Sequence, residues 1–326
     1  VTDRPIRPLF PKGFKNETQV MITVLQSDGE NMADVLAGVG ASAALMLSSI
    51  PWNGPIASVR VGRVNGEFIM NPTRTELDES DMEMVVSGNR ETVVMVEGEA
   101  DCVTEAEMLD ALKAAHEVIV EIIELQDELV AACDVQKDEV SIPKPDEGLV
   151  SRVEKEIGTQ VDDIVNISDK KERSDAKDDM VSKILDSMES EFPDEEKNIR
   201  SLIDESFKNG FREQVLSTGT RSDGRSTTDI REITVEPNIL PRTHGSVLFT
   251  RGETQALVVT TLGSKSDEMI VDSMDEDYKK SYYMHYNFPP YCVGEVGRIG
   301  FTGRREIGHG NLAQRAIKPV LPDYDD

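Results

Sequence analysis

RPIRPLFP at residues 4–11 and RAIKPVLP at residues 315–322 are two copies of one motif near opposite ends of the chain. The arginine, the isoleucine and the two shared prolines match, and most positions between them stay basic or apolar. A spacing close to the chain length excludes a solenoid and predicts a duplicated domain, cut out of phase with the duplication. We therefore expect the 326 residues, which begin at Val1, to be a fragment of a longer protein.

The second copy continues a basic stretch, GRREIGHGNLAQRAIKP at residues 303–319. Arg304 and Arg305 precede a turn predicted from Gly308 and Gly310, and apolar residues at helical spacing follow. Guanidinium groups beside the backbone N–H groups of a helix start form a site for phosphate. The alternative interpretation is that the two arginines make surface ion pairs.

The formal charge of −27 is unevenly distributed. Residues 76–220 hold 40 of the 62 acidic side chains but only 15 of the 35 basic ones. This middle part would repel a phosphate backbone, whereas the nearly neutral ends leave nucleic-acid binding open. A second interpretation of the acidity is solubility in a salty habitat.

Three isolated cysteines, Cys102, Cys133 and Cys292, indicate buried thiols in a reducing cytosol rather than a disulfide framework. No apolar run reaches the about 18 residues of a membrane span. The four histidines lack metal-ligand spacing. We expect a cytoplasmic protein without a membrane segment.

Hydrophobic patterns predict an α/β domain in the first part of the chain. Residues 18–26 (TQVMITVLQ) alternate like a strand, and residues 31–49 have apolar and small residues at helical spacing. Hairpins are predicted at residues 56–70, around Asn65-Gly66, and at 83–97.

A long helix and an all-α module follow. Thr104 and Glu107 form a capping box that starts the long helix. Its predicted inward residues are Met108, Leu112, Ala115, Ile119, Ile122, Ile123, Leu125 and Leu129. After a linker at 133–148, we expect further helices to start near Asp146, Ser168 and Pro193.

Strand patterns return after Arg221, at residues 230–235, 247–250, 254–262, 269–273 and 283–288. The segment 254–262 (TQALVVTTL) is apolar enough to be a central strand. Acidic residues gather between two of these strands, and we favour a solvated loop over a metal site; they are Asp272, Asp275, Glu276 and Asp277. The predicted fold is α/β (α+β), with partial mixed-sheet domains at 1–141 and 218–326 joined by a small all-α domain at 142–217.

Several long motifs resemble one family. SDGR (222–225), LPRTHGS (240–246), LFTRGETQA (248–256), HYNFPPY (285–291) and RREIGHG (304–310) are similar to the second RNase PH-like domain of the bacterial polynucleotide phosphorylases, or polyribonucleotide nucleotidyltransferases. DRPIRPLFP (3–11) and GASAAL (40–45) resemble the first such domain. The residues between resemble the family's helical linker domain more weakly, so that the resemblance covers essentially the whole chain.

The resemblance implies a fold and an activity. The fold has two RNase PH-like (ribosomal protein S5 domain 2-like) repeats in a homotrimeric ring around a channel for single-stranded RNA. Inorganic phosphate would attack the RNA 3′ end, release nucleoside diphosphates and so degrade mRNA from 3′ to 5′, and the reverse reaction would polymerise them. The implied cofactor is Mg²⁺, with ligands beyond the end of this chain, and degradosome partners are compatible with the family.

The resemblance also assigns site residues. Arg304 and Arg305 would contact RNA phosphate and incoming phosphate in catalysis, and His309 would bond a phosphate oxygen or position a loop. Arg315 would support the site or pair with an acid. Arg4 and Arg7 are the matching positions of the first repeat, where RNA binding is favoured over catalysis.

The family's Ser-rich phosphate loop and metal-binding aspartates lie outside the supplied residues, so we expect the chain alone to be inactive. One rival interpretation is a single-domain RNase PH or exosome-core subunit, which the helical module between two repeats argues against. Another is a non-catalytic RNase PH-like RNA-binding or exosome-type scaffold subunit. Arg304, Arg305 and His309 argue mildly against it.

Overall fold

A computed structural model describes residues 1–139, 145–272 and 277–322. Its residues form two compact units, Val1–Ile142 with Gly263–Asp326, and Pro143–Leu262. The mixture of helices and antiparallel sheets confirms the predicted α/β class. The prediction of three segments at 1–141, 142–217 and 218–326 stays a prediction.

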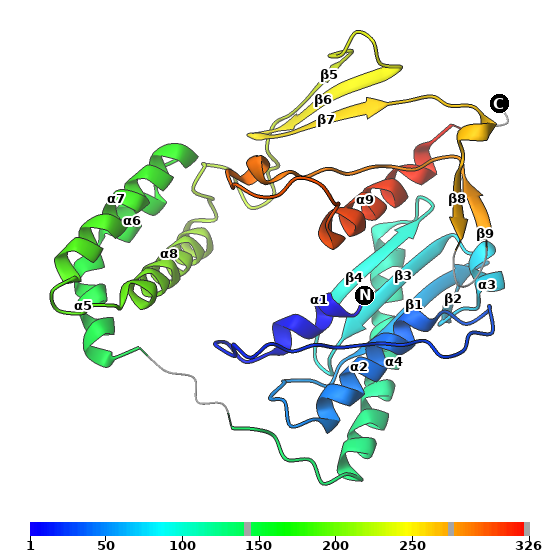
Figure 1. Cartoon of the computed structure of the whole chain (residues 1–326), viewed down its shortest axis with the longest axis horizontal. Helices are drawn as coiled ribbons and strands as arrows, with labels where there is room; N and C mark the ends of the chain where they lie inside the picture. The colour runs from blue at the N-terminus through cyan, green and yellow to red at the C-terminus, as the bar shows by residue number, and fades with distance from the viewer. Residues whose placement is uncertain (140–144, 273–276, 323–326) are drawn as a thin grey trace. The chain divides into compact units, whose positions relative to one another are not determined.

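The first unit is built on a four-stranded antiparallel sheet in the order β2-β1-β3-β4 (Figure 1). The strands are β1 (Ala57–Val64), β2 (Glu67–Met70), β3 (Met82–Gly88) and β4 (Val93–Ala100). Asn65 and Gly66 have φ of 52° and 82°, the left-handed values that a two-residue hairpin turn needs. Because β1 pairs antiparallel with β2, and β3 with β4, both predicted hairpins are confirmed.

Helix α4 (Glu105–Ala131) covers one face of this sheet and begins with the predicted capping box at Thr104. Val59 and Val61 of β1 pack against its buried stripe, which includes Ala115 and Ile119. The prediction of inward Leu125 and Leu129 was wrong, since Leu125 is 66% exposed and Leu129 44%. The buried stripe instead continues to Gln126, whose amide donates to the carbonyl of Ile56 at 2.9 Å.

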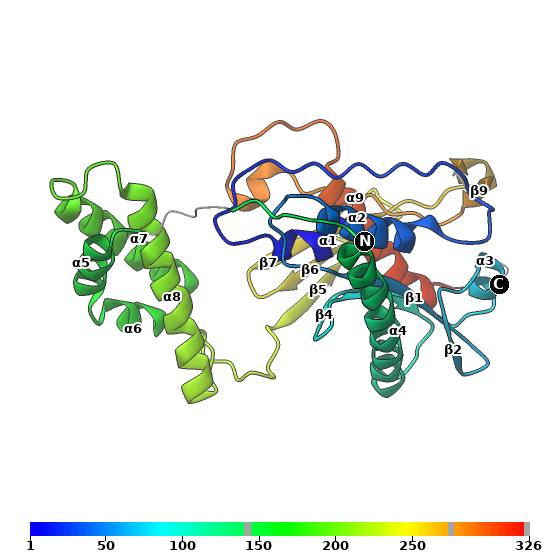
Figure 2. The ribbon, with the colours of Figure 1, turned by 90° about the horizontal axis from the view of Figure 1, so that it is seen from below.

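Helix α2 (Ala33–Leu47) covers the opposite face, as Figures 1 and 2 show. A Cβ on its Gly38 would lie 3.0 Å from the Ser58 hydroxyl, so this glycine allows the close approach that the slim helix predicted. Beside it, Arg60 of β1 is buried and pairs with Asp34 of α2 and Glu83 of β3. One guanidinium thus neutralises two carboxylates between helix and sheet.

The N-terminal motif forms α1 (Asp3–Ile6) and the 3-10 helix η1 (Arg7–Leu9). They pack with Trp52, whose indole N–H donates to the carbonyl of Ile6 at 3.0 Å. The strand predicted at 18–26 is wrong: this segment is irregular and exposed. A strand needs a neighbour for its backbone groups, and no described strand pairs with this segment.

The remaining elements of the first unit are helices α3 (Arg74–Asp78) and α9 (Arg304–Ile317), strands β8 (Met269–Asp272) and β9 (Asp277–Lys280), and three short 3-10 helices: η2 (Lys265–Asp267), η3 (Pro290–Val293) and η4 (Lys318–Val320). The strand predicted at 283–288 is wrong, because these residues are irregular and lie along α9 instead of pairing. Asp275 and Glu276 of the acidic cluster lie outside the described residues. All three cysteines are exposed, so the prediction of buried thiols was wrong.

Four helices fill the start of the second unit: α5 (Glu147–Ile157), α6 (Gln160–Val165), α7 (Lys170–Met188) and α8 (Glu196–Thr218). Figure 2 labels all four. Asp146 caps α5 and Asp169 caps α7, close to the predicted starts, whereas the short α6 was not predicted. Their shared aliphatic core includes Leu149, Ile184 and Ile203.

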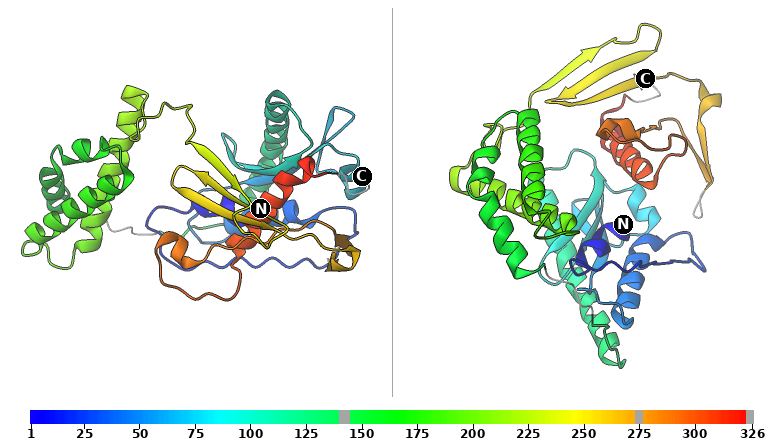
Figure 3. Two further views of the ribbon diagram at one scale, coloured as in Figure 1. Left: turned by 90° about the horizontal axis from the view of Figure 1, so that it is seen from above. Right: turned by 60° about the vertical axis from the view of Figure 1, so that its left-hand side comes forward.

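The second unit ends in a three-stranded antiparallel sheet, drawn yellow in Figure 3. Its order is β5 (Ile233–Pro237), β6 (Gly245–Arg251) and β7 (Thr254–Thr260). The prediction of a central strand at 254–262 was wrong, since β7 is an edge strand with every residue exposed. The apolar side chains of β7, such as Leu257 and Val258, are therefore open to solvent.

Candidate nucleic-acid and phosphate interface

The predicted phosphate site lies at the start of α9. The helix begins at Arg304, with Gly303 as its N-cap, so Gly308 and Gly310 lie inside the helix and not in the turn expected before it. Gly310 is buried, and a Cβ there would stand 3.0 Å from the Cβ of Tyr286. The glycine therefore serves close packing of α9 on the segment that precedes it.

Glu306 closes the first turn of α9. Its carboxylate accepts the backbone N–H groups of Gly303 at 2.7 Å and Phe288 at 2.8 Å. These two bonds, Gly303 first, lower the pKa of Glu306 below its ordinary value because they stabilise its charged form. The backbone N–H groups of Gly303 and Phe288 are thus bonded to the carboxylate of Glu306 and are not available to a bound anion.

Arg304 and Arg305 are exposed, and neither side chain forms an ion pair or hydrogen bond with any residue in the described ranges. The interpretation of the pair as surface ion pairs therefore finds no support in these ranges. Two free guanidinium groups on adjacent residues at a helix start are suited to bidentate contacts with phosphate.

His309 lies one turn beyond Arg305 on the same side of α9. Its ring stacks on Tyr286, with centroids 4.4 Å apart and planes 18° apart. Tyr286 in turn stacks on Phe288 with a centroid distance of 6.3 Å. The stack fixes the imidazole next to the arginine pair. Tyr286 was not predicted as a site residue, although HYNFPPY lay among the family motifs.

The other three predicted cations are ion-paired. Arg315 pairs with Glu99 at 3.2 Å and more distantly with Glu97 at 3.9 Å, which fulfils the alternative that it pairs with an acid. Arg4 pairs with Glu97 at 3.2 Å, and Arg7 bonds Asp3 within its own helical turn. The structure thus brings the two equivalent arginines of the repeated motif, Arg4 and Arg315, onto one carboxylate.

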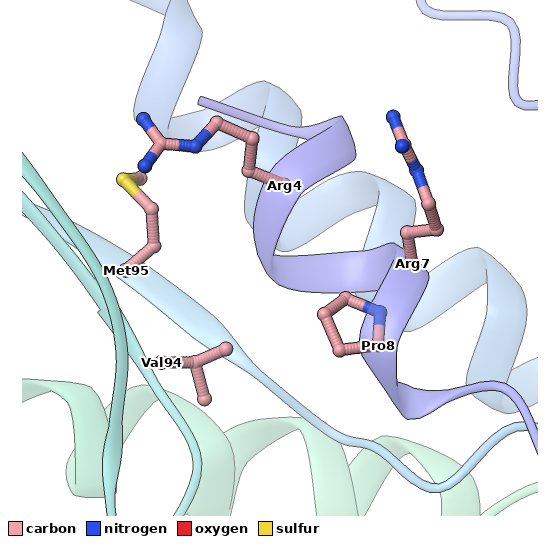
Figure 4. Close-up of a pocket in the computed structure, with 5 residues that line it drawn as sticks. All are labelled: Arg4, Arg7, Pro8, Val94 and Met95. Carbon is pink, nitrogen blue, oxygen red and sulfur yellow. The ribbon is translucent and has the colours of Figure 1, made fainter. Parts of the chain in front are cut away.

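Two hollows adjoin these paired arginines. One of about 320 Å³ lies between the N-terminal motif and β4 and is lined by Arg4, Arg7, Pro8, Val94 and Met95 (Figure 4). In this view the Arg4 side chain extends toward Met95, whereas Arg7 points away from it. The other, of about 640 Å³, has the basic lining residues Lys279, Lys280, Arg315 and Lys318. Sequence reasoning missed it, because its lysines come from β9 and η4.

Neither a metal site nor a membrane helix is found in the described parts of the chain. No group of three histidine, cysteine or acidic residues in those ranges could hold a metal ion. None of the described helices combines the length and the apolar character that crossing a bilayer requires.

Comparison with known proteins places this arrangement in a family. Models of the 3′ exoribonuclease family match the chain in both domains, domain 1 at residues 1–51 and 229–325 and domain 2 at 54–118. The RNA-binding domain of polyribonucleotide nucleotidyltransferase matches residues 148–226. Both copies of the repeated motif fall within the segments that the domain 1 model matches, as a duplication predicts.

Curated relatives give the same result. The polyribonucleotide nucleotidyltransferase of Syntrophotalea carbinolica is 48% identical over 324 residues, which cover 99% of this chain and 46% of that protein. That of Thermosipho melanesiensis is 46% identical and is covered to 48%, again over 99% of this chain. The chain belongs to the 3′ exoribonuclease family and, within it, to the polyribonucleotide nucleotidyltransferases. It spans about half the length of the curated relatives that it matches.

Proposed function

We propose that this chain is part of a phosphorolytic exoribonuclease that shortens single-stranded RNA from its 3′ end. An oxygen of inorganic phosphate attacks the phosphorus of the last phosphodiester. The bond to the 3′-oxygen of the preceding nucleotide breaks, and that oxygen takes up a proton. The products are a nucleoside diphosphate and an RNA shortened by one residue, and the reverse reaction extends RNA. Membership of the family supports this proposal.

At the level of residues, the proposal rests on Arg304 and Arg305, which are exposed and have no partner among the residues that the structure describes. Two anions must approach each other in this reaction, and fixed cations reduce their repulsion and stabilise the charge of the transition state. A chain of net charge −27 offers many carboxylates with which an arginine could pair. Arg304 and Arg305 pair with none of those in the described ranges, so both are available for RNA phosphate and for the incoming phosphate.

His309 is proposed to contact a phosphate oxygen from the same side of α9 as Arg305. Its stacking on Tyr286 limits the rotation of the ring and supports such a directed contact. Arg4 and Arg7 remain predicted RNA contacts, but RNA would have to compete there with Asp3 and Glu97. Arg315, which pairs with Glu97 and Glu99, is proposed to support the site.

Further features follow from the family and are part of the proposal: a homotrimer, cytoplasmic location, degradosome partners and Mg²⁺. The described residues do not offer a ligand set for Mg²⁺, so no step is derived through the ion. The chain's own contribution to the reaction is cationic and consists of binding and orienting the two phosphates.

The experiment combines binding and turnover. We expect Arg304→Ala/Arg305→Ala to weaken oligo(A) binding by the chain about 10-fold or more, because two phosphate contacts are lost. The control, Lys12→Ala/Lys15→Ala, removes equal charge from exposed residues and should change affinity less than 2-fold. Fluorescence anisotropy at a fixed salt concentration measures both. Equal losses in the two variants would contradict a specific role of the arginine pair.

Turnover is measured on a chimera in which residues 1–326 replace the matching half of the Syntrophotalea carbinolica relative. We expect phosphate-dependent release of ADP from poly(A), reduced at least 100-fold by Arg304→Ala. A folded chimera that binds RNA and releases no ADP would favour the non-catalytic scaffold instead.

A further inference from the structure

We propose that Glu97 and Glu99 of β4 are positioning residues for the arginine pair at the start of α9, and that they act through Arg315. The proposal rests on the proposed function, because it concerns how Arg304 and Arg305 are presented to RNA. Arg315 thereby becomes an anchor that holds the helix, rather than a direct ligand of phosphate.

The contacts define a clamp between β4 and the last turns of α9. Arg315 Nε lies 3.2 Å from a Glu99 oxygen, and a terminal guanidinium nitrogen lies 3.9 Å from Glu97. All three side chains are largely shielded, with exposures of 20%, 21% and 26% for Arg315, Glu97 and Glu99. Ion pairs at such sites are screened less by salt and lose less side-chain entropy than pairs on the open surface.

Two carboxylates stand opposite each other in the sheet beside Arg315. Glu99 stands directly opposite Glu83 in the β3–β4 register, and like charges in opposed positions destabilise a sheet. Arg60 pairs with Glu83. Among the described residues only Arg315 pairs with Glu99, so docking of α9 compensates the second charge of this cross-strand pair.

The clamp can set the direction of the helix. From Arg315 back to Arg304, α9 runs about 16 Å at 1.5 Å per residue. Glu306, Gly310 and Gln314 hold the helix along its length against residues 282–288. With the Arg315 pairs broken, α9 and this segment could shift together relative to β4 and displace the arginine pair.

The experiment measures the helix position directly. Spin labels are attached at Leu109 of α4 and Ile307 of α9, two exposed positions, after Cys102, Cys133 and Cys292 are changed to serine. We expect a narrow distance distribution that broadens in Arg315→Glu. It should narrow again in the charge-reversed Arg315→Glu/Glu99→Arg, which restores the pair.

A matched control and an affinity measurement complete the test. Arg90→Glu makes the same charge change at a pair between the β3–β4 turn and α4, and should leave the distances unchanged. Oligo(A) affinity should fall about 5-fold in Arg315→Glu and recover at least half of that loss in the charge-reversed variant. A direct phosphate contact by Arg315 would leave the reversed variant as weak as the single one and would overturn the positioning role.

The experiments distinguish failure of the positioning role of Glu97 and Glu99 from failure of the proposed RNA-binding role of the arginine pair. An unchanged distance distribution in Arg315→Glu would refute the clamp, whatever the RNA affinity. If the distribution responds as expected but Arg304→Ala/Arg305→Ala binds RNA normally, the clamp stands and the RNA-binding role of the arginine pair falls.

Discussion

At the scale of single residues, the chain uses its arginines in two ways. Arg60 and Arg315 are shielded and form ion pairs with carboxylates of the sheet. Arg304 and Arg305 are exposed and unpaired within the described ranges. Sequence patterns identified all but Arg60 as candidates but could not separate the two uses. The partners of Arg315 lie on a strand far away in the sequence, and no local pattern encodes such a contact.

Arg60 provides a stability prediction at this scale. Arg60→Ala should lower the free energy of unfolding by about 2–4 kcal/mol, because it leaves the partly buried carboxylates of Asp34 and Glu83 without the guanidinium that pairs with both. Arg90→Ala, which removes a more exposed ion pair, should cost about 1 kcal/mol or less. Urea unfolding followed by circular dichroism compares the two, and equal costs would show that burial of Arg60 adds nothing.

At the scale of elements, local turn and cap chemistry was the most predictable part of the fold. Asn65-Gly66 and the capping box at Thr104 specify their structures through a few adjacent residues. The segment 18–26 was wrongly predicted to be a strand, and β7 was rightly predicted to be a strand but wrongly placed at the centre of its sheet, since pairing and burial depend on partners elsewhere. The start of α9 was also missed, because glycines inside a helix imitate a turn.

Those two glycines of α9 differ in their surroundings and should respond oppositely to a methyl group. Gly308→Ala should stabilise the fold by about 0.5–1 kcal/mol, since a Cβ there meets nothing within 4 Å and alanine favours the helix. Gly310→Ala should lower the melting temperature, because its Cβ would press on Tyr286. Differential scanning calorimetry decides, and a similar gain in both variants would contradict close packing at Gly310.

The free energy of unfolding should depend on pH through the carboxylate of Glu107 at the start of helix α4. Thr104, through its backbone N–H and hydroxyl, and then Arg63 lower the pKa of Glu107 to about 2, and Arg63 also lowers that of Asp81. An unfolded glutamate has a pKa of about 4.3. The unfolded state therefore binds more protons in acid, and stability is lost as pH falls from about 5 toward about 2.

Glu107→Gln removes this carboxylate and should reduce the loss of stability between pH 7 and pH 4. The midpoints of urea unfolding at the two pH values measure that loss. Glu105→Gln removes an equal charge from the same helical turn and is the control. Identical pH dependence of the two variants would argue against the bonds of Glu107 as the cause.

At the scale of the whole molecule, the sequence predicted the class of fold and the all-α module, because long periodic segments and aliphatic cores carry strong signals. It also predicted a phosphate site at 303–319, which stays a prediction. In the described ranges Arg304 and Arg305 of this motif are exposed and have no partner, whereas Arg315 is ion-paired. The two hollows could not be predicted, because each is assembled from elements separated along the chain.

The carboxylate of Glu97 is shared by both copies of the motif, through Arg4 and Arg315. After a duplication, two equivalent positions can mutate independently, but a shared counter-ion makes the residues at both positions depend on one carboxylate. Among homologous genes, lineages that replace the acid at position 97 should also have altered the arginine at 4, at 315 or at both. Independent change at the three sites would mean that evolution has not treated them as a set.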